Sequence, residues 1–187
     1  TPSIIGMMVC FYNRRDCLEA VELLKRPFTL NGNIYRPLSI EYFDSASIQF
    51  MHKRVDGIPN ARCGLFIELD CDSGSFPHLS HYLDGLMRCG ADMDNAILAD
   101  NDIENRRLKS ARHAIPSGIN ELVVANGMPK LGTDFAVPST YLEWMMDAYE
   151  EVTVPSVLFG HIGDNHLHLN MLPRDSRELA IAKQSYI

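Results

Sequence analysis

Short apolar runs alternate along this chain with stretches in which apolar residues recur at helical spacing. Runs rich in apolar and β-branched residues predict strands, and spacing of i, i+3, i+4 and i+7 predicts amphipathic helices. A chain that alternates the two forms a domain of the α/β or α+β class. The predicted strands are Ser3–Phe11, Pro37–Tyr42, Gly64–Asp70, Asn95–Leu98, Asp134–Val137, Pro155–Gly160 and His166–Leu172.

Helices are predicted between these strands. One covers Asp16–Lys25, a second begins near residue 103 and is ended by Pro116, and a third covers Thr140–Glu150 with Ser139 as its N-cap. The first and third have a clear apolar face, which we expect to pack on the sheet. The residues on these faces are Cys17, Ala20, Val21 and Leu24 in the first helix and Leu142, Met145, Met146 and Tyr149 in the third.

Length and charge limit what this chain can be. Its 187 residues fit one domain, since domains cluster at about 100–200 residues. The net charge of −7 argues against nucleic acid as a partner, because such proteins usually present a basic surface. The apolar N-terminal stretch is shorter than the roughly 20 residues of a transmembrane helix, so it predicts a buried strand. The missing initiator Met and the helical spacing of Arg177–Ile187 lead us to expect a piece of a longer polypeptide.

The cysteines indicate the cellular compartment. There are five, an odd number, and no two form a Cys-x-x-Cys pair. We expect reduced thiols, mostly packed in the core of a cytoplasmic protein, and leave peripheral association with a membrane open. Their positions are 10, 17, 63, 71 and 89.

The stretch Val157–Pro173, VLFGHIGDNHLHLNMLP, contains three of the seven histidines. Two glycines and an Asp-Asn pair favour a turn between two strands. On the second strand, the period of two places His166, His168 and Asn170 on one face and apolar side chains on the other. The sequence therefore predicts a hairpin whose polar row faces a cleft and whose apolar row faces the core.

Two of these histidines are candidate metal ligands. His161 ends the first strand and His168 lies near the start of the second, so the reversal brings the two imidazoles within reach of one ion. Two imidazoles with a carboxylate and an open position suit zinc, iron or manganese. Histidines that flank a turn are also common as solvated loop residues, and the spacing alone leaves both interpretations open.

The segment GHIGDNHLHLN resembles the Gly-His-x-Gly-Asp-Gly-Asn-x-His signature of the C-terminal domain of FAD-linked oxidases. That family contains the FAD-linked polypeptide of glycolate oxidase, D-lactate dehydrogenases and D-2-hydroxyglutarate dehydrogenase. Arg112 in ARHAIPSGIN supports the resemblance, and Thr133–Trp144 looks like the family's Asp-x-x-Val-Pro junction. The resemblance extends over most of the chain. It implies an α+β fold in which ferredoxin-like βαβ units form an antiparallel sheet covered by helices.

The resemblance also implies roles for particular residues. His161 and His168 correspond to ligands of a divalent metal, namely zinc, manganese or iron. Asn170 corresponds to a substrate contact, and Arg112 to the group that grips the substrate carboxylate. A guanidinium suits this task because its planar fork of donors matches the two carboxylate oxygens. Without the resemblance, a surface salt bridge would be the favoured interpretation of Arg112.

This chain departs from the family pattern at two places. The Gly-Asn pair of the signature is Asn165-His166 here, so His166 is a candidate contact to the flavin, to the substrate or to the metal. Several members carry a lysine two residues before the Asp matched by Asp134. Gly132 stands there in this chain, and Lys130 lies two residues earlier, which makes it a weaker substrate-binding candidate.

The implied reaction is the FAD-dependent oxidation of a 2-hydroxy acid, of the glycolate, D-lactate or D-2-hydroxyglutarate type, to the 2-oxo acid. Residues 1–187 are interpreted as the substrate-capping, metal-bearing domain of this dehydrogenase. FAD would be held mainly by an FAD domain of the same polypeptide, and the catalytic base would lie downstream, so we expect the isolated chain to be inactive. The electron acceptor is unknown, and a homodimer is left open. The alternative function is a stand-alone metal- or carboxylate-binding module without redox activity.

Overall fold

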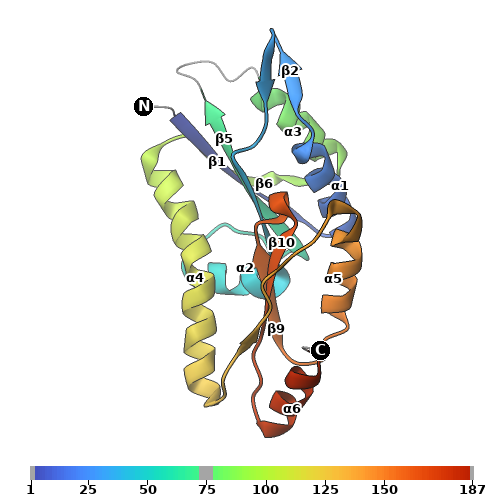
Figure 1. Cartoon of the computed structure of the whole chain (residues 1–187). Helices are drawn as coiled ribbons and strands as arrows, with labels where there is room; N and C mark the ends of the chain where they lie inside the picture. Colours follow the sequence, from blue (N-terminus) through green and yellow to red (C-terminus); the bar gives the residue numbers. More distant parts are fainter. Residues whose placement is uncertain (1–2, 72–77, 186–187) are drawn as a thin grey trace.

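The computed structural model describes residues 3–71 and 78–185 and shows a mixed α+β domain (Figure 1). The strands are β1 Ser3–Phe11, β2 Phe28–Leu30, β3 Asn33–Tyr35, β4 Ser39–Asp44, β5 Cys63–Cys71, β6 Asp92–Ala99, β7 Leu131–Gly132, β8 Phe135–Ala136, β9 Ser156–Gly160 and β10 His166–Met171. The α-helices are α1 Arg14–Lys25, α2 Ser45–His52, α3 Leu79–Arg88, α4 Asp102–Asn126, α5 Leu142–Glu150 and α6 Ser176–Gln184. Two short 3₁₀ helices are η1 Ser139–Tyr141 and η2 Ile162–Asp164.

An eight-stranded antiparallel sheet runs through the described part of the domain in the order β6-β1-β5-β4-β9-β10-β7, with β8 paired to β10. The first four strands in this order have the ferredoxin-like arrangement, because β1 and β4 are separated by β5 and joined through α1. Strands β9 and β10 extend the sheet beyond β4. The small β2–β3 hairpin lies apart, at the top of Figure 1.

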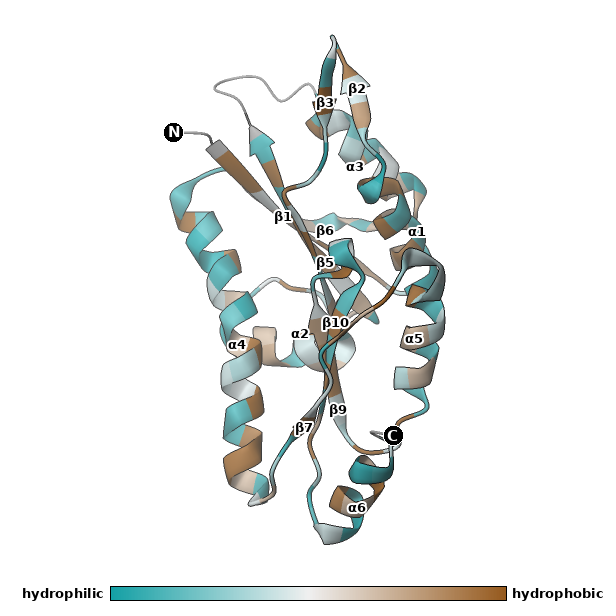
Figure 2. Ribbon diagram, in the orientation of Figure 1, coloured by the Kyte–Doolittle hydropathy of each residue, from teal (hydrophilic) through white to brown (hydrophobic). Residues whose placement is uncertain are grey.

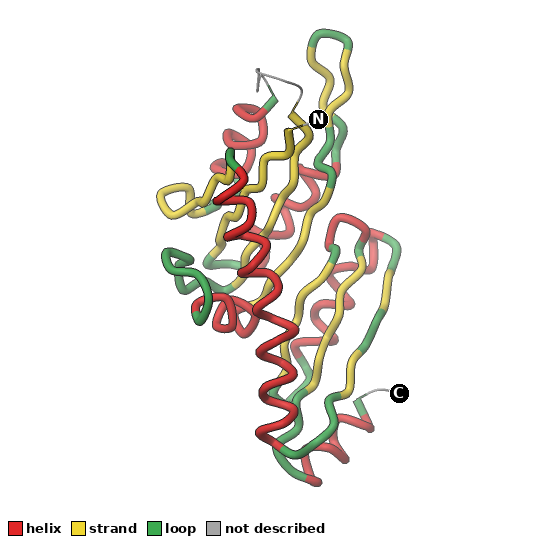
Figure 3. The backbone as a smooth tube through the Cα atoms, turned by 90° about the vertical axis from the view of Figure 1, so that its left-hand side faces the viewer, coloured by secondary structure: helices red, strands yellow, loops and turns green. Residues whose placement is uncertain are grey.

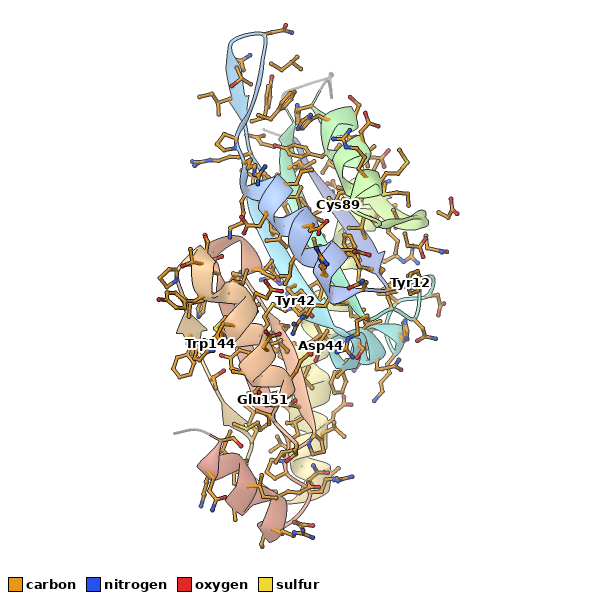
Figure 4. The ribbon with its side chains drawn as sticks, turned by 90° about the vertical axis from the view of Figure 1, so that its right-hand side faces the viewer. Tyr12, Tyr42, Asp44, Cys89, Trp144 and Glu151 are labelled. Carbon is orange, nitrogen blue, oxygen red and sulfur yellow. The ribbon has the colours of Figure 1, made fainter. Side chains whose placement is uncertain are left out.

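Helices cover the two faces of the sheet unequally. Helices α1, α3 and α5 pack on one face, where Figure 4 shows Trp144 projecting outward from α5. Helices α2 and α4 pack on the other face, α2 against β9, β4 and β5 and α4 against β6 and β1. Figure 2 shows β1 and β5 coloured largely as hydrophobic and much of the upper half of α4 as hydrophilic. Figure 3 shows β9 and β10 beside α4 rather than beneath it, which leaves part of this face less covered.

The predicted strands are all present, with ends shifted by a few residues. The predicted core positions of α1 and of α5 are buried.

The N-terminal apolar stretch forms β1, whose residues from Ile5 to Phe11 are buried. No described helix is both long and apolar enough to cross a membrane. Four cysteines are free thiols, three of them buried, and the side chain of Cys71 lies outside the described residues.

The prediction that Pro116 ends the second helix is wrong. Helix α4 continues through Pro116 to Asn126 and ends where Gly127 adopts a left-handed conformation with φ of 62°. An interior proline costs about 3 kcal/mol because it removes a hydrogen bond and its ring crowds the preceding turn. Here the proline lies on the exposed side, and the next turn buries Gly118 and Ile119 against α2, which offsets that cost.

The predicted N-cap of the third helix is also wrong. Ser139 begins the 3₁₀ turn η1, and α5 starts only at Leu142, without a side-chain cap. The Ser139 hydroxyl accepts hydrogen bonds from the amino group of Lys25 at 3.4 Å and from the amide of Asn165 at 3.1 Å. These contacts to distant residues replace the local capping that was predicted. A pattern of neighbouring residues in the sequence could not predict them.

The contact between α2 and α4 generates a stability prediction. A Cβ added at Gly118 would lie 2.1 Å from a ring carbon of Phe50. We expect Gly118→Ala to lower the free energy of unfolding by about 1–3 kcal/mol through overpacking, although alanine is the better helix former. Urea denaturation measures this, with Asn120→Ala on the exposed side of the same helix as the control. Equal stabilisation by both changes would show that the contact is loose.

Candidate metal and substrate site

The polar row predicted on β10 lies on the sheet face that α4 covers only in part. Leu167, Leu169 and Met171 point to the opposite face and are buried in the core under α1 and α5. The side chains of His166 and His168 are 30% and 27% exposed. The predicted division of β10 into a polar and an apolar face is therefore present in the structure.

Strand register brings residues from distant parts of the chain into one row across this face. Tyr42 pairs with Gly160, so the next positions, Glu41 and His161, lie opposite each other. The backbone N–H of His166 donates to the carbonyl of His161 at 3.1 Å, which adds β10 to the row. Strand β4, the residue that follows β9, and β10 thus contribute one side chain each, in the order Glu41, His161 and His166.

The turn between β9 and β10 is held by close backbone contacts and by α1. Gly160 has a φ of 145°, and a Cβ there would lie 2.8 Å from the carbonyl of His166, so a side chain at this position would force the strands apart. Asn165 adopts the left-handed conformation with a φ of 54°. Its side-chain oxygen accepts a hydrogen bond from the Lys25 amino group at 2.5 Å. Asparagine tolerates this conformation better than most residues, which suits it to the place of the family's glycine.

Asp134 joins two of the histidines. One of its carboxylate oxygens lies 2.5 Å from Nε2 of His166 and 3.0 Å from Nδ1 of His168. One ligand atom from each of the three residues lies within 4.8 Å of the others. Ligands about 2.1 Å from one ion are roughly 3.0–3.4 Å apart in octahedral or tetrahedral geometry, so small shifts of the two rings away from the carboxylate would admit an ion. The donor set and its spacing fit a divalent transition metal.

The protonation states also fit a metal. The pKa of the Asp134 carboxyl lies below its usual value because His166 hydrogen-bonds to it and because both histidines are close. Burial lowers the pKa of His168, against an opposing effect of Asp134. At neutral pH the carboxylate is therefore ionised and the imidazole of His168 is neutral, which are the forms that bind metal ions.

His161, a predicted ligand, lies beside this group but faces a different partner. Its ring centroid is 6.2 Å from those of His166 and His168, and its Nδ1 is 3.3 Å from the Glu41 carboxylate. The structure therefore brings the predicted pair His161 and His168 into one neighbourhood. Among the described residues, however, the group with metal-compatible spacing consists of His166, His168 and Asp134. Asp134 was predicted as the start of a strand and matched to the Asp of the family's junction, but not as a ligand.

Arg112, the predicted carboxylate-binding residue, reaches from α4 to Glu41. Its Nη2 lies 2.6 Å from the Glu41 carboxylate, whose side chain is only 4% exposed. Burial raises the pKa of Glu41, and Arg112 and His161 partly oppose this shift. The ion pair uses one guanidinium nitrogen of a side chain with five N–H donors, so Arg112 can hold Glu41 and still present donors to a ligand. The sequence analysis assigned no role to Glu41. The one feature that could have drawn attention to it is an acidic residue inside an otherwise apolar strand.

Lys130 and Asn170, the other predicted substrate contacts, meet at the far end of β10. The Lys130 amino group donates to the side-chain oxygen of Asn170 at 2.9 Å. Asn170 is buried, and it pairs with Gly132 of β7, two residues after Lys130. Lys130 lies two residues before the position of the family's lysine. Its side chain nevertheless reaches the same face of the sheet as Asn170.

The ion pair of Glu41 generates a prediction about pH. Arg112→Met would leave a buried carboxylate without its guanidinium, so we expect the free energy of unfolding at pH 7 to fall by about 1–3 kcal/mol. The pKa of Glu41 would rise further. A raised native pKa favours the native state at low pH and loses that effect as pH rises, so the deficit should shrink as pH falls through the raised native pKa values and be small by about pH 4, where Glu41 is protonated in both proteins.

Urea denaturation between pH 3.5 and 7.5 measures the deficit, using a range that brackets the ordinary carboxyl pKa of about 4.3. The control is Arg112→Met in a Glu41→Gln background, where no buried charge remains and the effect of removing Arg112 should be smaller. A deficit that is independent of pH and equal in both backgrounds would assign it to lost packing of the Arg112 side chain.

Comparisons with known proteins agree with this arrangement. The family described as FAD linked oxidases, C-terminal domain, matches residues 15–185, which include every strand of the sheet except β1 and every residue of the candidate site. A comparison with curated proteins gives no match. The match spans nearly the whole chain, and the antiparallel α+β fold is the one that the resemblance implied. The chain therefore belongs to the family of C-terminal domains of FAD-linked oxidases and is part of an oxidoreductase that uses FAD.

Proposed function

We propose that this domain binds a small 2-hydroxy acid, of the glycolate, D-lactate or D-2-hydroxyglutarate type, and a divalent metal, for oxidation to the 2-oxo acid in an FAD-dependent dehydrogenase. The observation that carries the proposal is the position of two cationic side chains and a buried amide on the same face as the imidazole and carboxylate group. Arg112 lies at one end of this face and Lys130 with Asn170 at the other. A 2-hydroxy acid needs these partners: cations for its carboxylate, and a Lewis acid for its hydroxyl.

Arg112 sets the orientation of the bound carboxylate. Its guanidinium is held on one side by the buried Glu41, so the remaining N–H groups are aimed before a ligand arrives. Lys130 supplies a second positive charge, and Asn170 supplies an amide whose oxygen is already engaged by Lys130. Such preorganisation lowers the cost of ordering side chains when substrate binds.

The histidine group would hold the metal next to the hydroxyl. When bound, FAD supplies the hydride acceptor and a divalent ion supplies Lewis acidity toward the hydroxyl and carboxylate oxygens. We propose that FAD is bound by a further domain of the same polypeptide and that the base that removes the hydroxyl proton comes from a downstream segment. The chain itself contributes position and charge. The electron acceptor is unknown, and cytoplasmic location and homodimer formation stay predictions.

The test uses the flavoprotein that contains this domain. We expect Arg112→Lys to lower kcat/KM for the best 2-hydroxy acid by a factor of about 10 to 100, because a planar, two-pronged contact becomes a point charge. Lysine keeps the charge beside Glu41, so stability should change little and flavin content should stay normal. Steady-state kinetics with glycolate, D-lactate and D-2-hydroxyglutarate measure this.

Arg106→Lys is the matched control, since Arg106 is an exposed residue of the same helix. Unchanged kinetics in both variants would make Arg112 a purely structural ion-pair partner. Bound flavin with no oxidation of any 2-hydroxy acid would reject the proposed substrate class. A protein without flavin would favour the second candidate, a metal- or carboxylate-binding module without redox activity, which the metal-compatible group by itself also supports.

A further inference from the structure

Lys25, the last residue of α1, reaches from its helix to the turn between β9 and β10. Its amino group donates to the side-chain oxygen of Asn165 at 2.5 Å, to the hydroxyl of Ser139 at 3.4 Å and to the carboxylate of Glu22 at 3.2 Å. An ammonium group has three N–H donors, so these three acceptors use all of them. The side chain is only 18% exposed. Lys25 therefore links α1, η1 and the turn.

The residue that Lys25 holds determines the shape of the turn. Asn165 is in the left-handed conformation, which disfavours residues that carry a Cβ. Its side-chain amide donates to Ser139 at 3.1 Å, and its backbone carbonyl accepts from the N–H of Val137 at 3.2 Å. Both polar atoms of the Asn165 side chain are thus bonded to groups outside the turn. These contacts, and not the turn itself, stabilise the left-handed conformation.

The conformation of Asn165 decides where two imidazoles lie. The carbonyl of His161 accepts from the N–H of His166 at 3.1 Å, and this bond closes the turn. His166 follows Asn165 directly in the chain, so a change in the dihedral angles of Asn165 would move His166 and break the bond to His161. Ile162 is buried and fixes the apolar side of the turn in the core. Lys25 fixes its polar side.

The ion pair with Glu22 is the alternative explanation for Lys25. The two residues lie three positions apart on α1, where such a pair stabilises a helix only slightly. The side chain of Glu22 is 51% exposed, so solvent weakens the pair further. The contact with Asn165 is shorter, at 2.5 Å against 3.2 Å, and joins residues 140 positions apart. The geometry therefore favours a role of Lys25 at the turn.

We propose that Lys25 is a positioning residue for the candidate site: it holds Asn165 in the left-handed conformation and thereby sets the places of the His161 and His166 imidazoles. Its effect on catalysis rests on the proposed function, whereas its effect on the imidazoles does not. Glycine adopts the left-handed conformation without any tether. Asn165→Gly should therefore remove the dependence of the turn on Lys25, and a merely stabilising lysine would not show this coupling.

The experiment is a double-mutant cycle of Lys25→Met and Asn165→Gly with two readouts: imidazole NMR signals of the metal-free chain, and steady-state kinetics of the flavoprotein. We expect Lys25→Met to shift the signals of His161 and His166. It should lower kcat/KM by about 10-fold, mainly through kcat, because a charge-assisted hydrogen bond that orients the site is lost. Asn165→Gly alone should resemble the wild type, and the double variant should resemble Asn165→Gly.

Glu22→Gln is the matched control, because it removes the ion pair and leaves the contact with Asn165. It should behave as the wild type does. Circular dichroism verifies that each variant is folded, and Lys25→Gln replaces Lys25→Met if the latter does not fold.

Three results would overturn the inference: equal losses from Lys25→Met with and without Asn165→Gly, losses from Glu22→Gln as large as those from Lys25→Met, or unchanged imidazole signals in Lys25→Met. The positioning role and the proposed reaction fail separately. If the flavoprotein oxidises no 2-hydroxy acid while the imidazole signals follow the expected cycle, the reaction is rejected and the positioning role is supported.

Discussion

The short pairing of β4 with β9 joins the ferredoxin-like part of the sheet to the β9–β10 hairpin, and the candidate site depends on it. Two residue pairs form the junction. The half-buried carboxylate of Asp44 strengthens it by accepting from the N–H of Leu158 at 3.0 Å and from the N–H of Ser47, at the start of α2, at 2.7 Å. Ser47 also donates its hydroxyl to the carbonyl of Leu158. Figure 4 shows Asp44 close to Tyr42, where α1 and α5 approach each other. One carboxylate thus caps a helix and binds the neighbouring strand, although burial raises its pKa.

Glu41 connects this junction to the candidate site. It lies three residues before Asp44 on β4, contacts His161 at the end of β9, and forms an ion pair with Arg112 of α4. A buried ion pair adds little net stability, because desolvation of the charges offsets their attraction. Its effect is on geometry: the pair ties the helix that covers one part of the sheet to the strands that carry the histidines. The position of Arg112 relative to the histidines is therefore set by a group that would not itself need to touch substrate.

Sequence periodicity was sufficient for the longer strands, for the buried faces of α1 and α5 and for the two faces of β10, because these depend on local alternation of polar and apolar residues. It did not predict the short strands β2, β3 and β7. It was insufficient for the partners of the histidines. Glu41 reaches His161 through the register of two strands that are far apart in sequence, and Asp134 reaches His168 through the pairing of β8 with β10. Register of this kind is decided by the packing of the whole sheet. The continuation of α4 beyond Pro116 has the same origin, since contacts with α2 outweigh a local helix-breaking preference.

The replacement of Gly-Asn by Asn165-His166 is explained as two linked changes. A non-glycine residue in the left-handed conformation costs about 1 kcal/mol, and Lys25 and Ser139 offset this by hydrogen bonding to the Asn165 side chain. The turn then keeps the geometry that glycine would allow, and the next residue stays in register on β10. An imidazole at that register position is longer than an asparagine side chain and reaches Asp134. The anchoring of the turn to α1 therefore permits the substitution that adds a third imidazole to the site.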